Sequence, residues 1–114
     1  MNFGKAISIG AVTVAADKTL FERDFTECMK DGANSAISSI ASDFIIPTAD
    51  QFIPTSFADL GNLALTGGIY AALDETVFDA CPYNSVMAKV IWGMGNAAVG
   101  SSYVYPIWAT NLGM

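Results

Sequence analysis

The scarcity of charged residues is the feature that most limits what this chain can fold into. Of its 114 residues, 53% are hydrophobic and only 14% are charged. A chain of this length forms one small domain with much surface for its volume, and so few charges cannot cover that surface in a free monomer. We therefore expect its apolar surface to be covered by lipid or by other protein chains.

The charges are unevenly distributed along the chain. All 11 acidic residues lie between Asp17 and Asp79, and after Asp79 the one charged residue is Lys89. The net charge is −6, and the five basic residues are scattered. This pattern argues against a nucleic-acid partner, because phosphate binding needs clustered positive charge.

Residues 1–16 form an apolar N-terminal segment. Lys5 followed by a short apolar run gives it the composition of a secretory signal. We interpret it as part of the folded chain, either as a short extended strand or as a segment at a membrane interface. Its β-branched residues favour the strand, and it is too short to cross a bilayer. These residues are Ile7, Ile9, Val12 and Val14.

An amphipathic helix is predicted over residues 19–46. Thr19 and Glu22 have the spacing of a capping box, and Pro47 prevents the helix from continuing. The face expected to be buried holds Phe21, Phe25, Cys28, Met29, Ala33, Ala36, Ile37, Ile40, Ala41 and Phe44, and the face expected to be wet holds Glu22, Asp24, Glu27, Lys30 and Asp31.

A linker with two prolines, residues 47–55, separates this helix from a hydrophobic helix at residues 56–73. Ser56 is the predicted N-cap, and Asp59 suits the first turn, where the helix dipole favours negative charge. The uncharged part of this helix rises roughly 21 Å, less than the roughly 30 Å of a bilayer core. It is therefore predicted to be a buried helix or half of a membrane-embedded hairpin.

A polar loop at residues 74–85 precedes a hydrophobic C-terminal helix and tail at residues 86–114, with Ser85 as the N-cap. Within this last part, residues 90–110 are uncharged and long enough to be a membrane-spanning helix. The sequence thus predicts a mainly α fold of three or four helices, with an extended N-terminal segment and membrane-embedded or membrane-apposed hydrophobic segments.

The C-terminal helix carries the residues predicted to make contacts. Small and polar residues spaced along it would let another helix approach closely, and aromatic residues near its two ends would lie at the membrane interfaces. The alternative is that the same residues form turns in a loop-rich C-terminal segment. The packing residues are Gly93, Asn96, Ala97 and Ser101, and the interface anchors are Trp92, Tyr103, Tyr105 and Trp108.

Catalytic chemistry has little support in the sequence. The chain has no histidine, and its glycines complete no phosphate-binding motif. The acidic clusters at residues 22–31 and 74–79 are interpreted as solvated, and two reduced thiols, Cys28 and Cys81, are favoured over a disulfide. We expect no enzymatic activity, no metal, no cofactor and no small-molecule substrate.

The sequence favours a non-enzymatic structural subunit of a larger assembly, such as a minor capsid or membrane protein of a virion with an internal membrane. Its expected partners are lipid and other protein chains, identical or different. One alternative is a pore-forming protein of the holin type, although such proteins usually end in a basic tail and this one does not. The other is a soluble oligomeric interaction or capsid module.

Overall fold

The computed structural model describes residues 3–47 and 57–111 of the chain. Within these ranges the protein consists of helices and short connections. The elements are α1 (Phe3–Leu20), α2 (Phe25–Ile45), α3 (Phe57–Leu73), η1 (Asp74–Phe78), α4 (Val86–Val99), η2 (Gly100–Val104) and α5 (Tyr105–Asn111), where η denotes a π-helix. Because η1 extends α3 and η2 joins α4 to α5, the fold is a compact all-α bundle of four helical rods, which confirms the predicted helical class.

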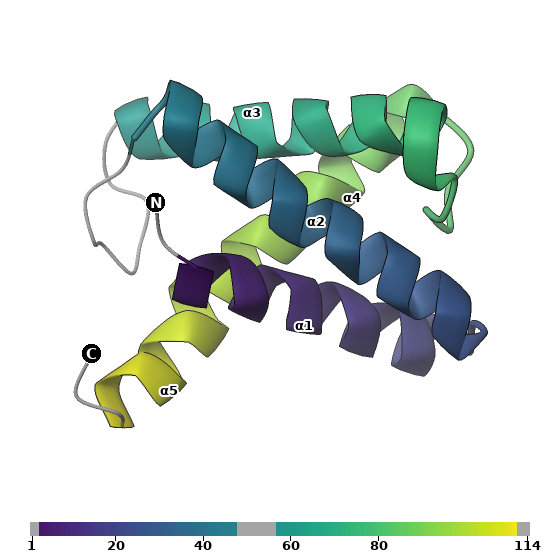
Figure 1. The fold of residues 1–114 in the computed structure, drawn as a ribbon, viewed down its shortest axis with the longest axis horizontal. Helices are drawn as coiled ribbons and strands as arrows, with labels where there is room; N and C mark the ends of the chain where they lie inside the picture. The colour runs from purple at the N-terminus through teal and green to yellow at the C-terminus, as the bar shows by residue number, and fades with distance from the viewer. Residues whose placement is uncertain (1–2, 48–56, 112–114) are drawn as a thin grey trace.

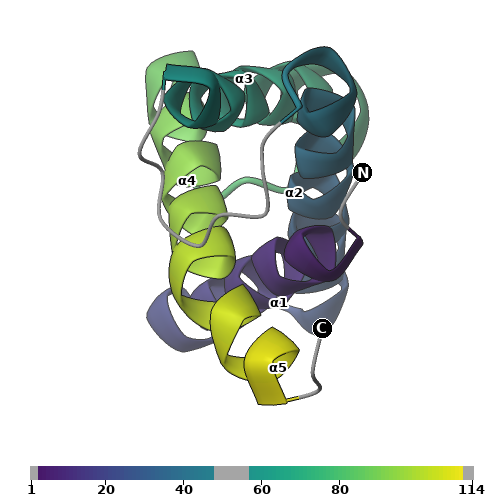
Figure 2. The same ribbon diagram turned by 90° about the vertical axis from the view of Figure 1, so that its left-hand side faces the viewer.

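The four rods surround one interior (Figures 1 and 2). In Figure 2, α3 and α1 lie above and below this interior, and α4 and α2 lie on its two sides. Figure 1 shows that the end of α1, the turn to α2 and the loop after η1 lie at the same end of the bundle. The Cα positions extend over 34 × 27 × 18 Å.

The expectation of an extended N-terminal segment is wrong, because this segment belongs to α1. Its buried residues recur at helical spacing, as Ala6, Ile9, Thr13 and Asp17 show. Gly10 lets α2 approach closely, since a Cβ there would lie 3.1 Å from the carbonyl oxygen of Gly32. This tertiary packing overrides the preference of β-branched residues for strands, which depends strongly on context.

The predicted capping box is also wrong. Thr19 lies in the last turn of α1, where its hydroxyl donates to the carbonyl oxygen of Ala15 at 2.7 Å. The chain then turns through Glu22, whose φ of 51° is left-handed, and α2 begins at Phe25. The other end of the predicted helix agrees with the structure, because α2 ends at Ile45, just before Pro47.

The later connections agree with the sequence in part. α3 begins at Phe57, while residues 48–55 of the predicted linker and the Ser56 cap lie outside the described residues. The predicted loop at residues 74–85 is shorter than expected, because η1 continues the helix to Phe78 and Asp79 ends it in the left-handed conformation. Ser85 is the N-cap of α4, as predicted, and its hydroxyl accepts the amide N–H of Ala88 at 3.1 Å.

Replacing Ser85 with alanine removes this capping bond. We expect S85A to lower the free energy of unfolding by about 1 kcal/mol, since an amide at the start of α4 loses its acceptor. Chemical denaturation followed by circular dichroism measures this loss, and S85D, which restores an acceptor, is the control. A variant S85A as stable as the original chain would contradict the assigned cap.

Residues 90–110 do not form the uninterrupted α-helix that was predicted to span a membrane. The backbone widens into η2, where the amide of Tyr105 donates to the carbonyl of Gly100, immediately before Pro106. Proline has no amide hydrogen, so the regular ladder of hydrogen bonds cannot pass through it. In the described parts of the chain, no helix combines the length and apolar character needed to cross a membrane. The loop-rich alternative for this segment is wrong too, because its described residues are helical.

Candidate functional site

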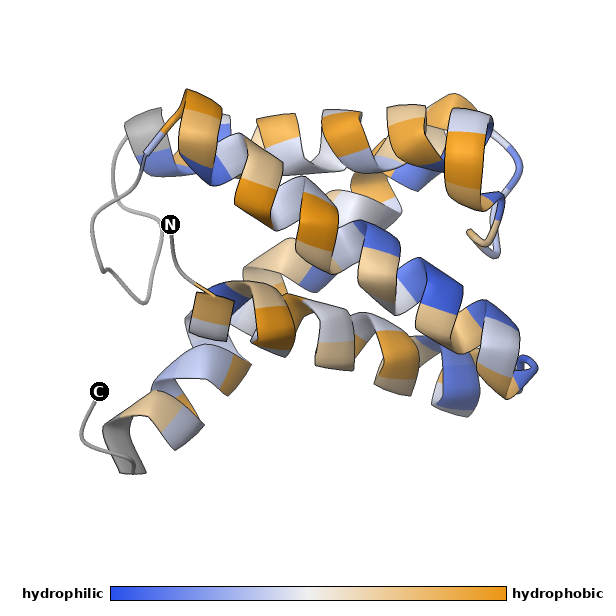
Figure 3. Cartoon of the chain, viewed as in Figure 1, coloured by the Kyte–Doolittle hydropathy of each residue, from blue (hydrophilic) through white to orange (hydrophobic). Residues whose placement is uncertain are grey.

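The polarity of the bundle is inverted relative to a protein that folds in water. Large apolar side chains lie on the outside: Leu20 and Met87 are each 70% exposed, and Phe44 is 69% exposed. Polar side chains lie inside, and Asp17 and Asn34 are 0% exposed. Figure 3 shows apolar residues along the outward sides of several helices. Because burying a polar group is costly unless it is hydrogen-bonded, the interior must supply its own partners.

The exposed apolar residues form rows along the helices, with members four positions apart. Positions spaced in this way lie on one side of a helix. None of these positions carries a charge, so each helix presents an uncharged strip to its surroundings. These apolar rows are Phe3, Ile7, Ala11 and Ala15 on α1; Met29, Ala33 and Ile37 on α2; Leu60, Ala64, Gly68 and Ala72 on α3; and Met87, Ile91, Gly95, Val99, Tyr103 and Ile107 on α4 to α5.

The exposed charges gather at one end of the bundle. Among the described residues, every exposed charged side chain comes from the end of α1, from the turn before α2, from the first turns of α2, or from η1 and the loop after it (Figure 1). We name this region the charged end. Water can solvate it, whereas the apolar rows are free of charge. Its exposed charged side chains are those of Lys18, Glu22, Asp24, Lys30, Glu75 and Asp79.

Between α2 and α3, a ladder of hydrogen bonds replaces the usual apolar core. The amide nitrogen of Asn34 donates to the carbonyl oxygen of Tyr70 at 3.0 Å, and the hydroxyl of Ser38 donates to the side-chain oxygen of Asn34 at 3.1 Å. Farther along, the hydroxyls of Thr66 and Ser42 lie 2.9 Å apart. All five residues are buried, so these bonds join the two helices in an environment that excludes water.

The ladder ends in a buried charged group at the opposite end from the charged end. The ammonium of Lys5 lies 2.9 Å from a carboxylate oxygen of Asp43, and the side-chain amide of Asn62 donates to the same oxygen at 3.0 Å. Lys5 comes from α1, Asp43 from α2 and Asn62 from α3. This group therefore ties three helices together.

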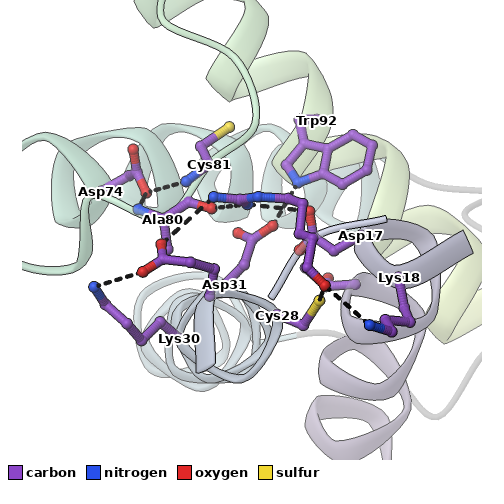
Figure 4. A network of polar contacts seen from close by, with 12 residues as sticks. Asp17, Lys18, Cys28, Lys30, Asp31, Asp74, Ala80, Cys81 and Trp92 are labelled. Carbon is purple, nitrogen blue, oxygen red and sulfur yellow. Dashed lines mark hydrogen bonds and ion pairs between the residues drawn. The ribbon is translucent and has the colours of Figure 1, made fainter. Parts of the chain in front are cut away.

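A second buried polar group lies at the junction of all four rods, beside the charged end (Figure 4). Arg23 in the turn after α1 places Nη1 3.2 Å from a carboxylate oxygen of Asp17 and also donates to the carbonyl oxygen of Ala80. On α2, Asp31 accepts the hydroxyl of Tyr70 from α3 and the indole Nε1 of Trp92 from α4, the latter at 3.0 Å. The group thus includes residues from α1, α2, α3 and α4.

Next to this junction, Asp74 closes the loop between η1 and α4. One carboxylate oxygen accepts the backbone amides of Ala80 and Cys81, each at 2.8 Å. The other lies 2.7 Å from the ammonium of Lys89, which also reaches Glu75 at 3.1 Å. The ion pair with Asp74 raises the pKa of Lys89 above its ordinary value, so the lysine stays charged although only 5% exposed.

Sequence reasoning assigned the wrong face of α2 to the interior. Ile37 is 47% exposed and Phe44 is 69% exposed, although both were predicted to be buried. Asp31 was assigned to the wet face and Asp74 to a solvated cluster, yet both are buried. A signal was present in the sequence: residues 34–43 include an asparagine, four serines and an aspartate, and these polar residues recur at helical spacing on one face of the helix.

The predicted packing residues of the C-terminal helix lie mainly against the chain itself. Gly93 faces Tyr70 of α3, where a Cβ would come 2.9 Å from the side chain, and Ala97 is 2% exposed. The side-chain amide of Asn96 donates to the carbonyl oxygen of Trp92. The hydroxyl of Ser101 donates to the carbonyl oxygen of Ala97 at 2.7 Å. Close approach of a helix from another chain at these positions stays a prediction.

The four predicted aromatic anchors have different surroundings. Tyr103 is 69% exposed in an apolar row. Trp108 bonds to the hydroxyl of Ser8 through Nε1 at 2.6 Å and packs edge-on against Tyr105. Trp92 packs edge-on against two aromatic rings at the charged end, those of Phe21 and Tyr83.

An apolar groove of about 610 Å³ lies between α1 and α4. Val12, Ala16 and Leu20 line it from α1, and Ile91 and Val99 are among its lining residues on α4. Gly95 lies in its wall, and within the described part of the chain a Cβ at that position would meet no atom within 4 Å. The groove therefore continues the uncharged surface of the apolar rows between two helices.

No feature of the described residues indicates a metal or a reactive thiol. Within residues 3–47 and 57–111, no group of three or more histidine, cysteine or acidic side chains is placed to hold a metal ion. Cys28 and Cys81 are both free, and burial raises the pKa of the Cys81 thiol. Because the thiolate is the reactive form, a raised pKa makes this thiol less nucleophilic.

Comparisons of the chain with protein-family models, with curated proteins and with solved structures found no match.

Proposed function

We propose that this protein is a small non-enzymatic structural subunit that lies in or against a membrane, with lipid covering its apolar rows and the charged end in water. The observation that supports this proposal is the inverted polarity of the bundle, in which apolar side chains lie outside and hydrogen-bonded polar groups lie inside. A fully buried large apolar side chain contributes about 1.5–3 kcal/mol, so leaving many of them in water is unfavourable. Acyl chains remove that cost, whereas the interior hydrogen bonds need no water.

The distribution of the apolar rows favours lipid over a single protein partner. A partner chain covers one face, but exposed apolar residues occur on every rod of the bundle. The interior also has features of helix packing in lipid, namely glycines at close helix contacts and side-chain hydrogen bonds between helices. Within this class we propose a minor capsid or membrane component of a virion, a choice that rests on the high apolar content and few charges of the chain.

Flotation with liposomes tests this proposal. We expect the purified protein, diluted from detergent, to float with lipid vesicles. Replacing Ile91 with glutamate, in the row on α4, should lower the bound fraction at least about tenfold, because placing a carboxylate in hydrocarbon costs ~2.5 kcal/mol or more. V77E is the matched control, since Val77 is 68% exposed but lies at the charged end, and it should bind like the original chain.

Three results would contradict the proposal. If the protein is a monomer in aqueous buffer without detergent, its exterior needs no cover. If it forms a defined oligomer there, identical chains rather than lipid cover the apolar rows. If vesicles loaded with dye leak at a low ratio of protein to lipid, the protein is pore-forming rather than structural.

A further inference from the structure

The junction beside the charged end brings together two buried carboxyl groups, Asp17 of α1 and Asp31 of α2, which we name the acid pair. Both residues are 0% exposed. The Oδ2 atom of Asp17 is buried and has no hydrogen-bond partner among residues 3–47 and 57–111, while its Oδ1 atom bonds to Arg23. Asp31 already accepts one bond on each oxygen, from Tyr70 and from Trp92. The pair therefore contains one acceptor atom that lacks a donor.

The positive charge near the acid pair is insufficient to balance two carboxylates. Arg23 is the cation that contacts Asp17, and it also contacts Glu27 at 3.5 Å. Lys89 is bonded to Asp74 and Glu75, and the ammonium of Lys18 points to the backbone carbonyl of Arg23. An unbalanced negative charge in a buried site is costly. The other titratable groups around the junction are Cys28 on α2, Tyr70 on α3 and Cys81 in the loop before α4.

We propose that the acid pair binds a single proton, which Asp31 donates to the unpartnered oxygen of Asp17, and that loss of this proton opens the charged end of the bundle. The proton supplies the missing donor and reduces the charge of the pair from two negative units to one, which Arg23 balances. Without it, two carboxylates on adjacent helices repel each other. Because Asp31 also holds Tyr70 and Trp92, this repulsion acts on all four rods.

The electrostatics of the site support this geometry. Burial raises the pKa of Asp31 to about 8, and the neighbouring carboxyl of Asp17 acts in the same direction. Asp31 in the folded chain therefore holds its proton at neutral pH, whereas an unfolded chain with an ordinary carboxyl near 3.8 does not. Since the folded state binds the extra proton, stability falls as pH rises from about 4, and this contribution is lost above about pH 8.

The acid pair contacts solvent through the side chain of Arg23, which is 18% exposed, whereas Asp17 is 0% exposed.

Trp92 reports directly on the state of the acid pair. Its indole bonds to Asp31 and packs against Phe21 and Tyr83, so opening of the charged end moves this ring into water.

The pH dependence of unfolding tests the shared proton. Between pH 6 and pH 8 we expect the folding equilibrium constant of the chain to fall about 50-fold, as expected for one proton held with a pKa of about 8. D31N carries a permanent amide donor and should lose this dependence. D24N is the matched control, because Asp24 is an exposed carboxylate at the same end whose side chain makes no capping bond, and it should keep the dependence. An unchanged pH slope in D31N would falsify the shared proton.

Two measurements on the folded protein do not require that D31N folds. Infrared spectroscopy should show the C=O stretch of a protonated carboxylic acid at pH 6 that disappears by pH 9. In a W108F background, where Trp92 is the remaining tryptophan, its emission should shift to longer wavelength over the same interval. Absence of the protonated acid at pH 6 overturns the proton site, and an emission maximum that does not move while the acid titrates overturns the opening of the charged end.

Discussion

Replacing Gly67 with alanine should destabilise the protein, whereas the same change at Gly68 should stabilise it. A Cβ at Gly67 would lie 2.4 Å from Cγ of Met94 and 2.6 Å from the carbonyl oxygen of Val90. The methionine can move, but the carbonyl belongs to the backbone of α4, so α3 and α4 must separate. We expect G67A to lower the free energy of unfolding by about 2 kcal/mol, after allowing for the better helix propensity of alanine.

Gly68 is the matched control for this change. It is the next residue on the same helix, but a Cβ there would meet no atom of the described residues within 4 Å. G68A should therefore raise the free energy of unfolding by about 1 kcal/mol through helix propensity alone. Both variants can be compared in one detergent by chemical denaturation followed by circular dichroism. Equal effects of the two substitutions would show that α3 and α4 do not approach each other at Gly67.

Replacing Lys89 with methionine should have the largest effect of any single charge removal in the described part of the chain. The change leaves Asp74, which is 1% exposed, as an uncompensated carboxylate beside the loop that it closes. Removing one partner of a buried ion pair typically costs about 3–5 kcal/mol, and we expect about 3 kcal/mol because the pair lies beside the charged end. Denaturation at pH 7 measures this loss.

A second substitution separates the charge effect from loss of packing. In K89M/D74N the carboxamide oxygen introduced at position 74 can still accept the backbone N–H groups of Ala80 and Cys81, but no buried charge remains there. We expect the double variant to recover much of the lost stability, which is a non-additive effect. K30M is the control for a surface pair, because the side chain of Lys30 is 43% exposed and its bond to Glu27 should contribute less than about 1 kcal/mol. If the double variant is no more stable than K89M, the loss of stability comes from packing and not from the uncompensated charge.

Local chemistry allowed several features of the fold to be predicted. A proline at position 47 forbids a helix from continuing whatever surrounds it, and α2 ends just before it. A serine at position 85 offers its hydroxyl to the amide three residues later, and it caps α4. The capping box at Thr19 failed because the same hydroxyl can instead bond to the carbonyl four residues earlier, and packing of α1 against α2 decided between the two.

The sequence predicts that the chain exposes much apolar surface, but it does not predict which helix faces carry that surface. Composition shows that this chain has more apolar surface than it can cover, and the exposed rows agree with that. Helical spacing shows which residues share a face, but it does not show which face points inward. On α2 the usual rule, which buries Ile37 and exposes Asp31, gives the reverse of the structure.

The sequence by itself determined two properties of this chain. Proline and serine caps act locally and set helix ends, and the composition leaves too few charges for the surface. The tertiary structure alone decided that the polar faces meet inside. Asn34, Asp31 and Asp74 become compatible with burial only where Tyr70, Trp92 and Lys89 of other helices complete their bonds. Such partners are distant in the sequence, and their energy exists only once the four helices are assembled.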